Sequence, residues 1–103
     1  MVEIIVIVII IVISIAMLAA TTLTAPGTAT FVGASISQPP ANSGLPATTV
    51  NDFRFFINGQ YIQSSLITLT QVGSNVVAVF NTGTLGYTLD PAVDIVIAIG
   101  KFN

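Results

Sequence analysis

Two aspartates near the C-terminus, Asp90 and Asp94, have the residue type and spacing that come closest to a metal site. They lie four positions apart across a proline turn, and carboxylate oxygens are ligands that Ca²⁺ prefers. Calcium takes about six to eight oxygen ligands, and no third acidic residue lies near this pair in the sequence. We therefore expect Asp90 to cap a turn and Asp94 to begin a solvated strand, with no metal bound.

Nucleophilic chemistry is excluded by the residues that the chain lacks. Ser14, Ser64 and Ser65 have no histidine anywhere in the chain to activate them, which excludes a hydrolase triad. The chain also has no cysteine, so it forms neither disulfides nor thiolate metal sites. The glycine pair in "GTLG" (83–86) is not followed by a helical pattern, so it does not predict a phosphate-binding loop. The sequence predicts no enzyme and no cofactor.

Nucleic acid is not an expected partner. The two basic residues, Arg54 and Lys101, are too few for a surface that follows a phosphate backbone. Four aromatic residues lie close together and could stack on bases, but without flanking basic residues they are expected to pack in a core: Phe53, Phe55, Phe56 and Tyr61. Asp52 and Arg54 lie two apart and are expected to form a surface ion pair worth under about 1 kcal/mol.

The composition points to burial against neighbours. Hydrophobic residues make up 53% of the 103 residues and charged residues only 6%, whereas an ordinary soluble domain is about 25% charged. A small monomer with so few charges does not keep its whole surface in water. We therefore expect stability to come from neighbouring copies of the chain or from lipid.

The most apolar stretch is at the N-terminus. Twelve of the fourteen residues from Val2 to Ile15 are valine or isoleucine. As a helix, residues 4–23 would span about 30 Å, the thickness of a bilayer core. The same residues also suit a helix buried in a protein assembly, or a strand buried on both faces, since β-branched residues favour extended structure. A cleaved signal peptide fits less well, because residues 1–5 carry no positive charge.

We expect residues 1–24 to form an apolar anchor, and we expect this anchor to be an α-helix that lies in a membrane or in an assembly. All three interpretations bury the segment against lipid or other subunits. The residues expected to make these contacts are Ile4, Ile5, Val8, Ile9, Ile11, Val12 and Ile15.

Residues 25–49 are expected to form an extended neck. Pro26 and Gly27 end any helix, because proline cannot continue the hydrogen-bond ladder. Residues 28–36 can form one strand. Residues 38–46 are an uncharged connector rich in proline and glycine.

Residues 50–103 are expected to form an antiparallel β-domain. In "DFRFFI", Phe53, Phe55 and Ile57 alternate with Asp52, Arg54 and Phe56, as in a half-buried strand, so these three apolar residues should lie in the core. Asn58 and Gly59 follow at once, and both tolerate the positive φ of a type I′ hairpin.

Further strands are expected in "LITLTQ", "VVAVFN" and "VDIVIAI", with a turn at residues 73–75. The stretch "TGTLGYTL" (82–89) is expected to form a loop and a short strand. About five strands in this length predict a small antiparallel sandwich or barrel. The expected fold class is therefore mainly β, with an apolar α-helix at the N-terminus.

Two stretches, "VNDFRFFINGQYIQ" (50–63) and "GYTLDPAVDIVIAIGKFN" (86–103), resemble small β-modules of tailed-bacteriophage structural proteins. Such modules carry an aromatic-rich strand, an "NG" hairpin and a last strand of the form D-x-V/I-x-I. The resemblance covers residues 50–103 and implies a virion component, such as a fibre, appendage or surface protein. It implies no catalytic residues. The partners would be copies of the chain itself and other structural subunits.

The layout is also similar to type IV-like pilins, particularly archaeal ones, in which an apolar N-terminal helix precedes a charge-poor β-domain. This similarity implies a subunit of an extracellular filament at the cell surface, with the N-terminal helices in the filament core. A third possibility is a single-span membrane protein whose β-domain binds a soluble partner.

Overall fold

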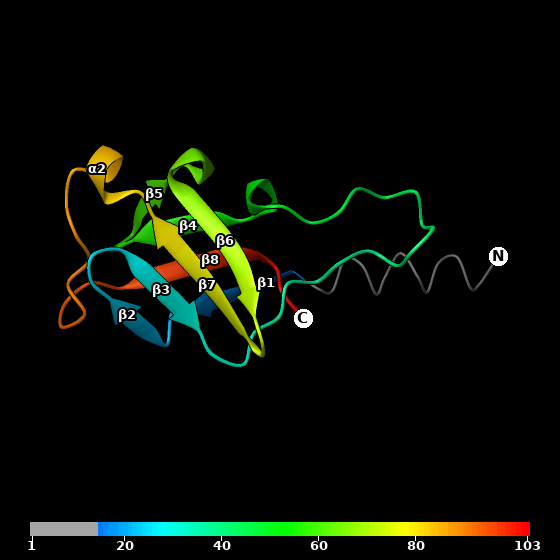
Figure 1. Ribbon diagram of the computed structural model, residues 1–103, viewed down its shortest axis with the longest axis horizontal. Helices are drawn as coiled ribbons and strands as arrows, with labels where there is room; N and C mark the ends of the chain where they lie inside the picture. The colour runs from blue at the N-terminus through cyan, green and yellow to red at the C-terminus, as the bar shows by residue number, and fades with distance from the viewer. Residues whose placement is uncertain (1–14) are drawn as a thin grey trace.

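The computed structural model describes residues 15–103, which fold into two four-stranded antiparallel sheets. Sheet A has the strand order β1-β8-β4-β5, and sheet B has the order β2-β3-β7-β6. The two sheets lie one behind the other in Figure 1. The mainly β fold expected from the sequence is therefore confirmed.

The strands of sheet A are β1 (Ile15–Ala19), β8 (Val96–Lys101), β4 (Arg54–Ile57) and β5 (Gln60–Ile62). The strands of sheet B are β2 (Thr22–Thr24), β3 (Thr28–Phe31), β7 (Asn75–Phe80) and β6 (Ile67–Val72). Three single helical turns connect them: η1 (Val50–Asp52), η2 (Ser64–Leu66) and α2 (Thr82–Leu85).

The expected N-terminal helix is wrong for residues 15–24, which form β1 and β2. The reason is tertiary pairing: β1 lies antiparallel to β8, and β2 lies antiparallel to β3. The chain crosses between the sheets where the Ala20 N–H donates to the Val96 carbonyl and the Thr21 N–H donates to the Thr30 carbonyl, each at 2.8 Å. The remaining expected anchor residues lie outside the described residues: Ile4, Ile5, Val8, Ile9, Ile11 and Val12.

The sandwich begins at β1, well before residue 50. β3 falls within the strand expected at 28–36 and lies between β2 and β7, so it is an interior strand of sheet B. The connector that follows extends from one end of the sandwich and returns to η1 (Figure 1). Within the described part of the chain, no helix is long and apolar enough to cross a membrane.

A cluster of aromatic side chains fills the space between the sheets. Five of the six phenylalanines are buried: Phe31, Phe53, Phe55, Phe80 and Phe102. The ring centroid of Phe55 in sheet A lies 6.5 Å from that of Phe31 and 6.0 Å from that of Phe80, both in sheet B. Such tilted and edge-to-face pairs are favourable arrangements of aromatic rings. The inward side chains of both sheets therefore form one core.

Two tight turns set the register of the hairpins. Asn58 and Gly59 have φ of 52° and 83° and join Ile57 to Gln60, which are paired across β4 and β5. These angles fit the type I′ turn that the sequence predicts. In sheet B, Gly73 has φ of 58° and begins the two-residue turn between the paired residues Val72 and Asn75.

Two local expectations are wrong. Residues 82–85 form α2 in place of part of the expected loop, because the Asn81 side chain accepts the Thr84 N–H at 3.2 Å and caps the turn. The ion pair of Asp52 is made with Lys101, at 3.5 Å, instead of with Arg54. Asp52 belongs to η1, so it does not share a strand face with Arg54, which begins β4.

Candidate assembly surface

The two aspartates that first suggested a metal site hold a loop together. Asp94 accepts the Asp90 N–H through Oδ2 at 2.7 Å and the Asn58 side-chain amide through Oδ1 at 2.9 Å. These two hydrogen bonds, that from the Asp90 backbone first, lower the pKa of Asp94. Asp90 Oδ1 accepts the Ala92 N–H at 2.9 Å. Within residues 15–103, no group of three histidine, cysteine, aspartate or glutamate residues is placed to hold a metal ion.

Asn58 has a second role that the sequence did not indicate. Its side-chain oxygen accepts the Ile95 N–H at 2.8 Å, and its backbone N–H donates to the Ile95 carbonyl at 2.8 Å. Together with its bond to Asp94, these contacts join the β4–β5 turn to the start of β8. The arrangement is structural, and it fixes β8 against β4.

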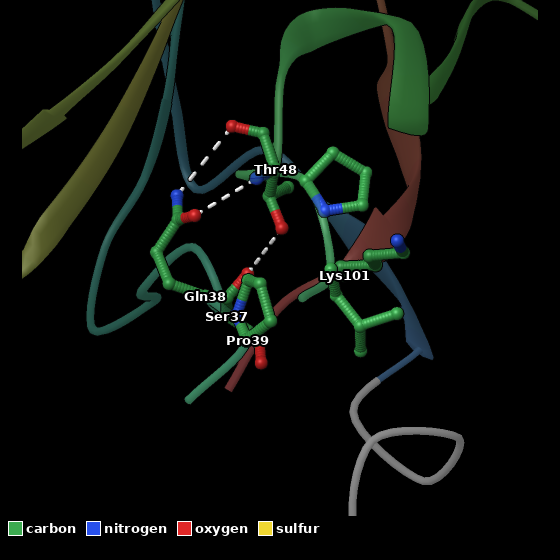
Figure 2. Close-up of a pocket in the computed structure, with 7 residues that line it drawn as sticks. Ser37, Gln38, Pro39, Thr48 and Lys101 are labelled. Atoms are coloured by element: carbon green, nitrogen blue, oxygen red, sulfur yellow. Dashed lines mark hydrogen bonds between the residues drawn. The ribbon is translucent and has the colours of Figure 1, made fainter. Parts of the chain in front are cut away.

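A small hollow lies at the base of the connector (Figure 2). Its volume is about 160 Å³, and it is lined by Ser37, Gln38, Pro39, Leu45, Pro46, Thr48 and Lys101. Gln38 accepts the Thr48 N–H at 2.8 Å, and the Thr48 hydroxyl donates to the Ser37 carbonyl at 2.6 Å. Lys101, the charged residue of the lining, pairs with Asp52. Ser37, Gln38 and Thr48 thus bond to each other and hold the two ends of the connector together, while Lys101 bonds outside the lining.

The surface that stands out chemically is the outer face of sheet A. Alternation along β8 directs Val96 and Ala98 into the core and leaves Ile97 and Ile99 half-buried on the other side. The pairing register aligns Met17 with Ile99 across β1 and β8. We call the following residues the apolar face: Ile15, Met17, Phe56, Tyr61, Ile97 and Ile99.

The apolar face is strongly exposed at its two ends. Met17 on β1 is 68% exposed, and Ile15 is 57% exposed. At the other end, Tyr61 on β5 is 54% exposed, and its ring contacts that of Phe56 with centroids 5.8 Å apart. The apolar side chains therefore run across all four strands of sheet A.

The outer face of sheet B has a different character. At the β6–β7 turn its outward positions hold Asn75 and Val72, which is 53% exposed. Farther along the strands, six threonines surround two valines in register across the four strands. We call this set the threonine face: Thr22, Thr24, Thr28, Thr30, Thr68, Thr70, Val77 and Val79. Hydroxyl groups can bond to water while the β-branched carbons favour the strand.

The apolar face ends at an open sheet edge. β1 is the first strand in the order of sheet A, and within the described residues its second edge pairs with no strand. Its sequence, "IAMLA", holds no lysine, proline or other residue that natural proteins use to protect an exposed edge. Sheet A therefore offers both apolar side chains and free backbone groups to a partner.

The structure places the three groups of residues singled out from the sequence in three different settings: the core, a turn and an edge strand. Phe53, Phe55 and Ile57 are 2%, 0% and 1% exposed and lie in the core, while Asn58 and Gly59 form the turn. The expected anchor residue within the described range, Ile15, lies on β1.

Sequence reasoning did not identify the apolar face. A signal was available in "VIAIGK", because β8 has apolar residues in both phases of the strand alternation. Such a strand needs cover on both sides.

No protein-family model matches the chain, and neither the curated proteins nor the solved structures include a significant match. Within the described residues, the features that bear on function are therefore the fold and the contrast between the two outer faces.

Proposed function

We propose that this protein is a non-enzymatic structural subunit that assembles with copies of itself and with other subunits, as a fibre, appendage or surface component of a virion. The observation that carries the proposal is the apolar face, which covers the outer side of sheet A up to its open edge. The resemblance of residues 50–103 to bacteriophage β-modules supports the choice of a virion.

Leaving the apolar face in water is unfavourable compared with burying it against a partner. Burying one large apolar side chain fully is worth about 1.5–3 kcal/mol. Soluble monomers rarely expose contiguous apolar patches larger than a few hundred Å². The apolar face holds six large apolar side chains, and Arg54 and Lys101 lie in the same rows at its rim. An apolar centre with a polar rim is typical of protein interfaces.

A subunit of an extracellular filament is the second candidate. It is favoured by the run of valine and isoleucine that leads directly into β1, with no linker between the run and the sandwich. In either assembly, the threonine face is the side suited to water.

Two matched charge substitutions in the full chain test the proposal. Met17→Asp places a charge on the apolar face, and Val79→Asp places the same charge on the threonine face, where Val79 is 46% exposed. Both positions are exposed, so both variants should keep the circular-dichroism spectrum of the parent. We expect the parent and the Val79 variant to form large particles that sedimentation and electron microscopy detect, and the Met17 variant not to form them.

Equal assembly of the two variants would refute the proposal. The shape of the parent particles also separates the two candidates: a helical filament without a capsid favours the filament subunit, and an icosahedral or tailed particle favours the virion component.

A further inference from the structure

We infer that the apolar face is covered by residues 2–14 of a neighbouring copy of this chain. The inference rests on the proposed assembly and names the contact that builds it. Its basis is the position, length, turn chemistry and charge of the segment that precedes β1.

The segment joins the sandwich at the edge of the sheet that needs cover. It ends immediately before Ile15, the first residue of β1. β1 also carries Met17, which at 68% is the most exposed member of the apolar face. Thirteen residues span about 43 Å as a strand or about 20 Å as a helix. Four strands are about 14 Å across. In either conformation the segment is long enough to cross the face.

The covering segment comes from a different copy. To reach the outer face of its own sheet, the chain would have to reverse direction immediately before Ile15. Tight reversals favour glycine, proline, asparagine, aspartate and, more weakly, serine. Of these, residues 2–14 contain only Ser14, which lies between two isoleucines. A neighbouring copy can supply its segment without a reversal, and repetition of this contact from copy to copy produces a polymer.

Charge supports the same pairing. The segment carries one charged residue, Glu3. At the rim of the apolar face, Arg54 lies in the row of Ile99 and Met17 and has no ion-pair partner within residues 15–103. A single acidic group in an otherwise apolar segment is therefore complementary to a single available guanidinium beside an apolar surface.

Disulfide trapping tests the inference, because the full chain has no cysteine of its own. One variant carries Ile9→Cys in the segment, a second carries Tyr61→Cys on the apolar face, and a third carries Thr68→Cys on the threonine face as the matched control. The Ile9 variant is assembled with each of the other two and oxidised, and linked peptides are identified by mass spectrometry. We expect the link between positions 9 and 61 and no link between positions 9 and 68.

The outcomes distinguish this inference from the proposed function. If particles form but the 9–61 link is absent or no stronger than the 9–68 link, the inference is overturned and the proposed assembly stands. If no particles form, the proposed function fails, and the inference fails with it. A chain carrying both Ile9→Cys and Tyr61→Cys, assembled with an excess of parent chain, should lose the 9–61 link. Persistence of that link within one chain would also overturn the inference.

Discussion

The outer faces of the two sheets differ sharply although the sheets have the same strand number and the same antiparallel pairing. Sheet A presents isoleucine, methionine and aromatic side chains, whereas sheet B presents six threonines and three valines. Both sets of residues suit strands, since β-branched and aromatic residues favour extended structure. Strand formation therefore does not require the apolar side chains of sheet A.

This difference distinguishes the positions whose residue type is set by folding from the positions whose residue type is set by what contacts the outer face. Inward positions of both sheets must be apolar, because they fill one common core. Outward positions are set by what covers the face, and threonine satisfies the strand while leaving a hydroxyl for water. An apolar outer face that folding does not need supports the proposed assembly.

The largest expected effect separates the inner and outer sides of a single strand, β4. Phe55 is 0% exposed in the core, so Phe55→Ala should lower the free energy of unfolding by about 3–5 kcal/mol. Phe56 is half-buried on the apolar face, so Phe56→Ala should lower it by less than half as much and should weaken assembly. Chemical denaturation and sedimentation of both variants provide the measurements.

Equal losses of stability in the two variants would show that the apolar face is part of the folding core. The outward residues of sheet A would then stabilise the fold as much as the inward residues do, and their apolar character would not indicate a contact with a partner.

A smaller effect compares the tight turns of the two sheets. Gly59 in the β4–β5 turn and Gly73 in the β6–β7 turn both have positive φ, which a β-branched residue resists. Gly59→Val and Gly73→Val should each lower the free energy of unfolding by about 1–3 kcal/mol. At both glycines an added Cβ would meet no neighbouring atom, so the cost arises from the backbone alone.

Thermal unfolding of the two variants checks this expectation. If either melts within a degree or two of the parent, its turn does not hold the positive φ described. A clear loss in both would show that the two sheets depend equally on their hairpins, despite their different outer faces.

The smallest expected effect is a pH dependence of the loop that precedes β8. The Asp90 backbone N–H and the Asn58 amide lower the pKa of Asp94 below its ordinary value of 3.8. A carboxyl whose pKa is depressed in the folded state contributes stability above its unfolded pKa and loses it as the pH falls through the folded pKa. The parent should therefore lose stability as the pH falls from the unfolded pKa of Asp94 through its lower folded pKa.

Asp94→Asn provides the control, because an amide does not titrate. Denaturation midpoints measured from pH 6 to below the folded pKa should fall more steeply for the parent than for this variant. Parallel curves would mean that the hydrogen bonds of Asp94 do not favour its charged form.

Much of the fold could be predicted from local patterns. The alternation in "DFRFFI" indicates which phenylalanines are buried, and Asn58-Gly59 indicates a type I′ turn, because both signals depend on neighbours in the chain. Asn81 and Gly86 are the N-cap and C-cap of α2. Because α2 has only four residues, no helical period lies between them to indicate a helix. For the apolar face, the available sequence signal was weaker: a strand such as β8 has apolar residues at both its inward and its outward positions.

The sequence by itself determined the mainly β class, the inward side of β4 and the position of the first hairpin, since each follows from the period of a strand or the φ of a turn residue. Tertiary structure decided that Ile15–Ala19 is a strand, because its backbone hydrogen bonds are made with β8, about eighty residues later in the chain. It also decided that Asp52 pairs with Lys101 and that six apolar side chains meet on one outer face. Long apolar runs suit helix, strand and membrane alike, and only a partner strand selects among them.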